Sequence, residues 1–220
     1  MTQFADEVLR EYSLYVDVSD VNFFHSKLDI SATGNEQDLV VLPCHLGERV
    51  CDQCSVDALD ESFLIYMVIM EEFGVRIPFT AFGMDVLKFL NVASSQIRPN
   101  RWAFIRGFEI LCKALHLEPS VGVFFHFYGL RMFTRISISA HPGNKLFPPY
   151  ASNFKKEWRD SFARIQGAPE CSTASVLVEG KPKFPLRWTY APLAVMGYDF
   201  NRMTPYERCM VCFLEKCGPP

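Results

Sequence analysis

Acidic side chains are the first candidates for chemistry in this 220-residue sequence. Three convergent carboxylates can hold the two divalent metal ions that cut or join a nucleic-acid strand. The available acids are Asp57, Asp60, Glu61, Asp85 and Asp160. No local signature ties any three of them together, so a metal-dependent nuclease is the third-ranked interpretation. We predict no catalytic residue and expect that the protein is not an enzyme.

Two groups of cysteines have spacings that suggest zinc ligation. Cys44-His45 precedes Cys51-x-x-Cys54, which together offer four ligands but only one Cys-x-x-Cys hook. Near the C-terminus, Cys209-x-x-Cys212-x4-Cys217 resembles the start of a zinc knuckle, although Cys217 stands where histidine is expected. This second segment has helical periodicity, which favours cysteines acting as small hydrophobic residues. We therefore predict no metal and no cofactor.

A nucleophilic cysteine would need a histidine beside it. Cys112 and His116 are one helical turn apart, but Cys112 belongs to the apolar face of its helix. The sequence favours a buried structural thiol at this position.

Basic residues form the remaining candidate site, a contact with nucleic-acid phosphates. The candidates are Arg98, Arg101, Trp102, Arg106, Lys155, Lys156 and Arg159. Trp102 either stacks on a base or anchors the start of a helix in the core. The net charge of the chain is −3, whereas nucleic-acid-binding domains are usually basic. Nucleic acid is therefore the alternative partner, not the favoured one.

Charge is distributed unevenly along the chain. Residues 1–97 contain 5 Lys/Arg and 16 Asp/Glu, a net charge of −11, whereas residues 98–187 contain 14 and 6, a net charge of +8. The two halves either neutralise each other within the fold, meet a polyanion, or attract neighbouring copies of the chain. The last alternative predicts self-association that weakens with salt.

The first residues do not resemble a secretory signal, because Met1–Tyr12 carries Asp6, Glu7 and Glu11. No uncharged apolar run of roughly 18 residues occurs. We expect an intracellular protein with reduced thiols and no membrane partner.

The apolar pattern predicts an α+β fold, with a helical array in the first and central part followed by a small antiparallel sheet and a C-terminal helix. Helices are expected at 2–18, 61–73, 81–90, 99–116 and 205–217, with Gly74, Thr80, Asn91 and Thr204 as caps. Ser94 and Ser95 are expected to open one further turn. Strands are expected at 38–43, 133–139, 175–178 and 183–188. Residues 120–130 fit a buried helix or a strand, and 158–165 fit a strand or a short helix.

Residues 74–130 contain the phrases GVRIPFTAFGMDVLKF and LNVASSQIRPNRWAFIRGFEILC, and FPLRW follows later. These segments resemble the domain catalogued in plant genomes as the putative gypsy-type transposon domain, sometimes labelled a transposase. The similarity extends over about residues 38–190. It divides the chain into an N-terminal helix and loop (1–37), the transposon domain (38–190) and a C-terminal helical tail (191–220).

The resemblance implies a retrotransposon origin and no assigned active site. The Tyr-x-Asp-Asp string of reverse transcriptases does not occur, and neither does the Asp-Thr-Gly or Asp-Ser-Gly string of retroelement proteases. We therefore predict a non-enzymatic, gag-like role in protein association, with a second copy or another retroelement protein as partner. Relatives continue into a coiled coil, which implies a truncated copy here.

Overall fold

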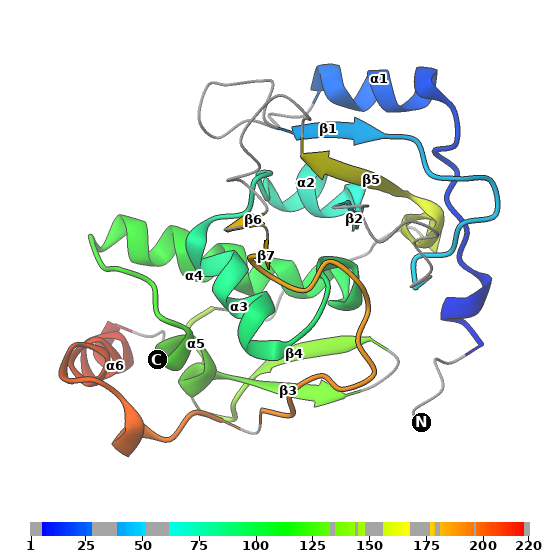
Figure 1. Cartoon of the computed structure of the whole chain (residues 1–220). Coiled ribbons are helices and arrows are strands. Elements are labelled where there is room, and N and C mark those ends of the chain that lie inside the picture. Colours follow the sequence, from blue (N-terminus) through cyan, green and yellow to red (C-terminus); the bar gives the residue numbers. More distant parts are fainter. Residues whose placement is uncertain are drawn as a thin grey trace.

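The computed structural model describes residues 6–27, 39–51, 62–132, 135–143, 145–147, 156–167, 177–178, 181–195 and 197–217. Figure 1 shows the sheet that contains β1 and β5 at the top of the view and the hairpin of β3 and β4 at the bottom, with helices between them. The predicted α+β class is confirmed. No described helix is long and apolar enough to span a membrane.

The three-stranded sheet joins segments that are far apart in the sequence. It has the antiparallel order β1-β5-β2, formed by Leu39–Leu42, Phe162–Gly167 and Phe63–Tyr66. The central strand β5 pairs Ile165 with Val41 on one side and with Phe63 on the other. The strand expected at 38–43 is confirmed, and 158–165 contains both a 3-10 turn and the start of β5.

Two of the predicted helices are wrong in part. The segment expected to be helical over 2–18 has one 3-10 turn, Val8–Arg10, and is irregular from 11 to 17; residues 1–5 are outside the described set. The next helix, α1, runs over Val18–Lys27. The helix expected at 61–73 begins as strand β2 and becomes helical only in α2, Met67–Phe73. Pairing with β5 provides the backbone partners that convert its first part to a strand.

The predicted caps of the central helices are confirmed. Thr80 caps α3 (Ala81–Leu90), since its Oγ1 accepts a hydrogen bond from the Gly83 amide at 3.0 Å. Gly74 and Asn91 end α2 and α3 with left-handed backbones. The turn predicted at Ser94 is a 3-10 turn, Ser94–Gln96. The helix expected at 99–116 consists of a 3-10 turn, Pro99–Arg101, followed by α4, Trp102–Ala114.

Residues 120–130 contain both of the expected alternatives. Helix α5 (Val121–Phe127) leads directly into β3 (Tyr128–Met132), which pairs with β4 (Ile136–Ala140) as an antiparallel hairpin. A short pair, β6 (Leu177–Val178) and β7 (Lys181–Pro182), follows. The strand expected at 183–188 is wrong, because this segment is irregular and its Trp188 indole binds Ser95 Oγ instead of extending a ladder.

The C-terminal helix α6 (Pro205–Cys217) forms as predicted and packs on α5. Its start is a capping box, in which the Glu207 amide donates to Thr204 Oγ1 at 3.3 Å and the Glu207 carboxylate accepts from the Thr204 amide at 2.8 Å. The Glu207 carboxylate also accepts the Ser120 hydroxyl at the start of α5. These hydrogen bonds lower the pKa of Glu207, although its partial burial acts in the opposite direction.

Aromatic rings fill the core between the helices and the hairpin. The Phe124 ring lies at the centre, with its centroid 5.7 Å from Phe82, 5.4 Å from Phe108 and 4.8 Å from Tyr128. Phe79 stacks on Trp102 at 5.1 Å and links this cluster to the sheet through Phe63. The core is therefore continuous from the sheet to the hairpin, as the apolar stripes of α3 and α4 predict.

Candidate functional site

An open groove of about 860 Å³ lies between α3 and α4. Its apolar lining comes from the end of α2, the connection to α3 and the two helices themselves. Val75, Pro78, Phe79, Phe82, Trp102, Ile105, Ile110 and Leu117 belong to it. Ile110 is 54% exposed, so part of this lining remains in contact with solvent. We refer to this cavity as the α3–α4 groove.

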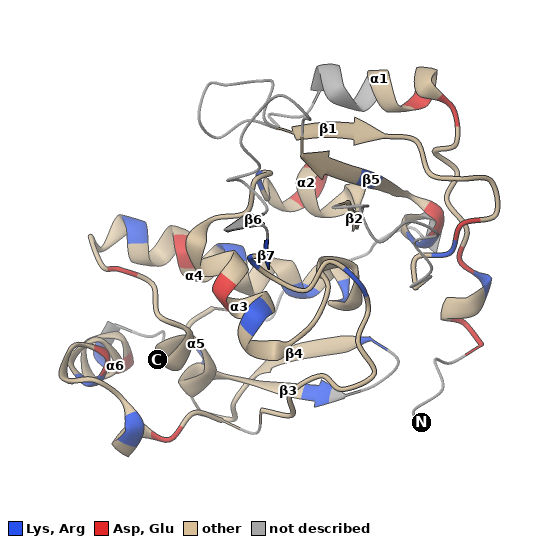
Figure 2. Cartoon of the chain, in the orientation of Figure 1, with Lys and Arg blue, Asp and Glu red and all other residues tan. Residues whose placement is uncertain are grey.

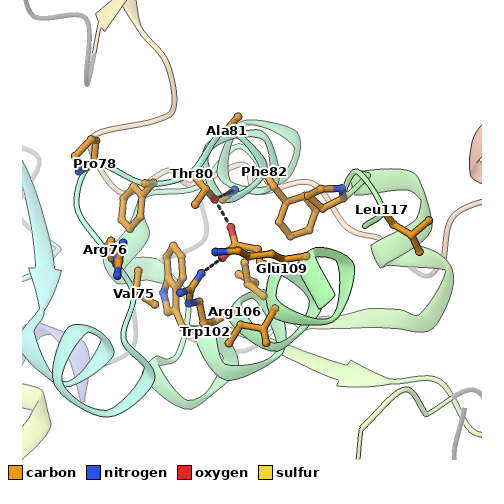
Figure 3. Close-up of a pocket in the computed structure, with 16 residues that line it drawn as sticks. Val75, Arg76, Pro78, Thr80, Ala81, Phe82, Trp102, Arg106, Glu109 and Leu117 are labelled. Atoms are coloured by element: carbon orange, nitrogen blue, oxygen red, sulfur yellow. Dashed lines mark hydrogen bonds and ion pairs between the residues drawn. The ribbon is translucent and has the colours of Figure 1, made fainter. Parts of the chain in front are cut away.

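The charged residues of the α3–α4 groove are mainly basic. Arg76, Arg106 and Lys113 line it against a single acid, Glu109. Figure 3 shows Glu109 joined to Thr80 of the facing segment and to Arg106 of its own helix. The Arg106 guanidinium lies 3.2 Å from the Glu109 carboxylate. With three basic side chains and one acid, the lining of the groove has a net positive charge.

The N-terminal segment and the loop after β1 expose both apolar and acidic side chains, which we call the N-terminal patch. It consists of Tyr12, Leu14, Val18 and Leu46, with Asp17 and Asp20 beside them. Backbone contacts bring the two segments together, since the Cys44 amide donates to the Tyr15 carbonyl at 2.8 Å. Leu14 is 66% exposed and Leu46 92% exposed. Figure 2 shows acidic residues along the N-terminal segment and the start of α1, on the other side of the view from α4.

The central helices and the first hairpin strand carry the sequence similarity. Residues 65–132 match the family described as Putative gypsy type transposon. The match confirms the resemblance for the segment from β2 to β3, which contains both walls of the α3–α4 groove. No curated protein and no solved structure matches the chain.

The structure separates the seven predicted nucleic-acid contacts into different groups. Trp102 is 2% exposed and its indole donates to the Ser94 carbonyl, so it anchors α4 and cannot stack on a base. Arg106 is paired with Glu109, and Arg159 lies 2.7 Å from Glu7. Arg98 and Arg101 flank Pro99 at the turn before α4 and form no salt bridge with any described residue.

The second predicted basic cluster is only partly described. Lys155 lies outside the described residues, and the side chain of Lys156 does as well. Arg159 follows in the same 3-10 turn, Lys156–Asp160, where its guanidinium lies over the Trp158 ring at 5.1 Å. Its contacts with Glu7 and Glu11 connect the turn to the N-terminal segment.

Two further arginines, Arg131 and Arg135, were not singled out from the sequence. Arg131, near the end of β3, acts electrostatically on Arg101. Arg135 is 3% exposed and donates to the Glu11 carboxylate and to Tyr66 Oη, the latter at 2.9 Å. The partner of Arg135 is 124 residues away in the sequence, so no local pattern could have indicated this contact.

The acidic and cysteine candidates do not form a described metal site. Asp57, Asp60, Glu61 and Cys54 lie outside the described residues. Asp85 lines a hollow of about 400 Å³ together with Glu118 and Glu207, and Asp160 ends the turn after Trp158. Among the residues with described side chains, no three His, Cys, Asp or Glu are placed to hold a metal ion.

The described cysteines divide into buried and exposed thiols. Cys44, Cys51 and Cys112 are buried, whereas Cys209 and Cys212 lie exposed on α6. Burial raises the pKa of Cys44 and of Cys112 to about 12. The thiolate is the reactive form of cysteine, so both buried thiols are expected to be inert. Cys112 is a structural thiol, as the apolar face of α4 predicts.

We expect a maleimide to label Cys209 and Cys212 of the folded protein and to leave Cys44 and Cys112 unmodified. With a pKa of about 12, the thiolate fraction at about pH 8 is only about 10⁻⁴. This fraction increases with pH but remains minor below about pH 11. Peptide mapping by mass spectrometry measures each site separately. Labelling in urea is the control, because unfolding must make all four thiols reactive; equal labelling without urea would contradict the burial.

Proposed function

We propose that this chain functions by associating with further copies of itself, as a structural, gag-like element of a transposon-derived protein and not as an enzyme. The observation that carries the proposal is the presence of two complementary surfaces on one chain. The α3–α4 groove is apolar with an excess of positive charge, and the N-terminal patch is apolar with exposed acids. The patch of one copy would occupy the groove of the next.

The apolar residues supply the attraction in this arrangement. Leu14 and Val18 of the patch and Ile110 of the groove are more than half exposed in the single chain. Their removal from water stabilises an interface by about 25 cal/mol for each Å² buried. The charges add specificity and speed, because opposite potentials steer the encounter and exclude other orientations.

Because the two surfaces differ, each contact leaves one free patch and one free groove. Head-to-tail contacts of this type continue from copy to copy, either into a closed ring or into an open array. Such continued assembly suits a structural role. The family match supports a transposon origin, and the paired state of Glu109 supports a groove built for binding rather than for acid–base chemistry.

We expect sedimentation velocity at low salt to show concentration-dependent assembly that weakens as salt is added. Screening over about 10 Å at 0.1 M salt removes much of the charge attraction. Ile110→Asp is expected to raise the dissociation constant at least about tenfold, because it places a charge in the apolar lining. Phe213→Asp is the matched control, since Phe213 is 45% exposed on α6 outside the groove and the patch.

Charge reversal tests the pairing of the two surfaces. Lys113→Glu alone and Asp20→Lys alone are each expected to weaken assembly about tenfold by placing like charges opposite each other. The double variant carrying both changes restores opposite charges at every contact and is expected to recover assembly. A strictly monomeric wild-type protein at low salt and high concentration would contradict the proposal, as would single variants that assemble normally.

A further inference from the structure

Three arginines outside the α3–α4 groove form a cluster of positive charge. Arg98 and Arg101 belong to the turn before α4, and Arg131 belongs to β3. The Arg98 amide donates to the Ile136 carbonyl at 3.0 Å, which fixes the turn to β4. Since β4 pairs with β3 and places Ser137 opposite Arg131, the hairpin carries Arg131 towards the same region. We refer to these three residues as the arginine cluster.

The positive charges of Arg98 and Arg131 act on Arg101, in agreement with the backbone contacts that bring the three residues together. Burial is the largest cause that lowers the pKa of Arg101, and the positive charges of Arg98 and Arg131 lower it further. Like charges that repel one another in this way destabilise the fold unless an anion is present. The cluster is therefore an unfavourable arrangement for the isolated chain.

No described acid neutralises the arginine cluster, since none of its three side chains forms a salt bridge with a described residue. Four other described arginines differ in this respect. Arg106, Arg135, Arg159 and Arg164 each contact a glutamate. In addition, Arg101 Nε is buried without a hydrogen-bond partner, and its guanidinium lies 5.8 Å from the centre of the Phe104 ring.

We propose that the arginine cluster binds the phosphate groups of a nucleic-acid strand. Guanidinium groups bind phosphate through two parallel hydrogen bonds, and unpaired arginines have these donors available. The exposed Arg98 and Arg131 provide the first contacts, and the half-buried Arg101 is positioned to complete them. Because Trp102 is buried and cannot stack on a base, recognition is limited to the backbone and is independent of base sequence.

The test uses the full chain and a fluorescent single-stranded oligodeoxynucleotide, with binding measured by anisotropy at several salt concentrations. We expect binding at low salt that weakens as salt rises, with a slope of about −0.7 in log K against log salt for each phosphate contacted. The double variant Arg98→Ala/Arg131→Ala is expected to bind at least about tenfold more weakly and to reduce the slope by about 1 to 2. Both residues are exposed, so the fold is expected to remain intact.

Arg208→Ala is the matched control, because it removes one exposed arginine from α6 at a distance from the cluster in the sequence. It is expected to leave affinity unchanged. Competition with inorganic phosphate and with polyglutamate identifies the anion. Absence of binding at low salt would overturn the proposal, and so would an equal loss of affinity in all variants. It would also be overturned if polyglutamate displaced the labelled strand as effectively as the unlabelled strand does. The self-association variants leave the cluster intact, so the two proposals fail independently.

Discussion

Arg135→Ala is expected to lower the free energy of unfolding by about 3–5 kcal/mol, the loss typical when one partner of a buried ion pair is removed. Arg135 lies between the Glu11 carboxylate and the rings of Tyr66 and Trp158, at 5.6 and 5.1 Å from their centres. Without the guanidinium, the Glu11 carboxylate remains buried with only its contacts to Tyr66 and Arg159. Urea denaturation followed by tryptophan fluorescence measures the change.

A double-mutant cycle separates the ion pair from the packing. Glu11→Leu/Arg135→Met replaces both charges with apolar side chains and is expected to be less destabilised than the sum of the two single variants. Arg131→Ala is the control, because Arg131 is exposed and lies only four residues before Arg135 in the sequence. This substitution is expected to change the free energy of unfolding by no more than about 0.5 kcal/mol. If Arg135→Ala were equally mild, the N-terminal segment would not be held by this contact.

The second large effect is expected for Phe124→Ala, which should lower the free energy of unfolding by about 3–5 kcal/mol. Phe124 is fully buried and its ring contacts four other rings, those of Phe82, Phe108, Phe125 and Tyr128. Truncation at this position removes the shared neighbour of α3, α4 and β3. The cavity is expected to remain, because α3, α4 and β3 are held by their own contacts and cannot all collapse inward.

Phe124→Leu and Phe213→Ala are the matched comparisons for this change. Leucine retains much of the buried volume, so its effect is expected to be less than half of that of alanine. Phe213 is 45% exposed on α6, and its truncation is expected to change stability by about 0.5 kcal/mol or less. Chemical denaturation measures the loss in free energy of unfolding for each of the three variants. Similar losses for Phe124→Ala and Phe213→Ala would show that the ring cluster is not the centre of the core.

Local signals explain which parts of this fold can be predicted from the sequence. Thr80 and Thr204 precede their helices and accept amide hydrogen bonds within three residues, so their roles depend on nearby atoms. Gly74 and Asn91 adopt left-handed backbones that few other residues tolerate. These signals are independent of the rest of the molecule, and the helix ends that they mark are correct.

Long-range pairing explains the errors. The residues of β2, Phe63–Tyr66, are all buried and have no alternation that distinguishes a strand from a helix. Their conformation is decided by β5, about a hundred residues later in the chain. Likewise, Glu11 has the appearance of an ordinary acid in an amphipathic helix, and only its contact with Arg135 shows why the segment around it is irregular.

The candidate site was predictable to a smaller extent. Arg106 and Glu109 are three residues apart on one helix, so their salt bridge was available from spacing alone and should have removed Arg106 from the nucleic-acid candidates. The pairing of Arg159 with Glu7 was not available, because 152 residues separate them. The groove itself depends on the angle between two helices, which no local pattern encodes.

The position of β5 between β1 and β2 has a consequence for synthesis on the ribosome. Both outer strands, and all of residues 65–132, are synthesised before their central partner at 162–167. During that interval the two edges have no backbone partner from β5 and are open to pairing with nascent chains nearby. Completion of the sheet is thus tied to translation of β5, and a pause before residue 162 would prolong an intermediate that is prone to aggregation.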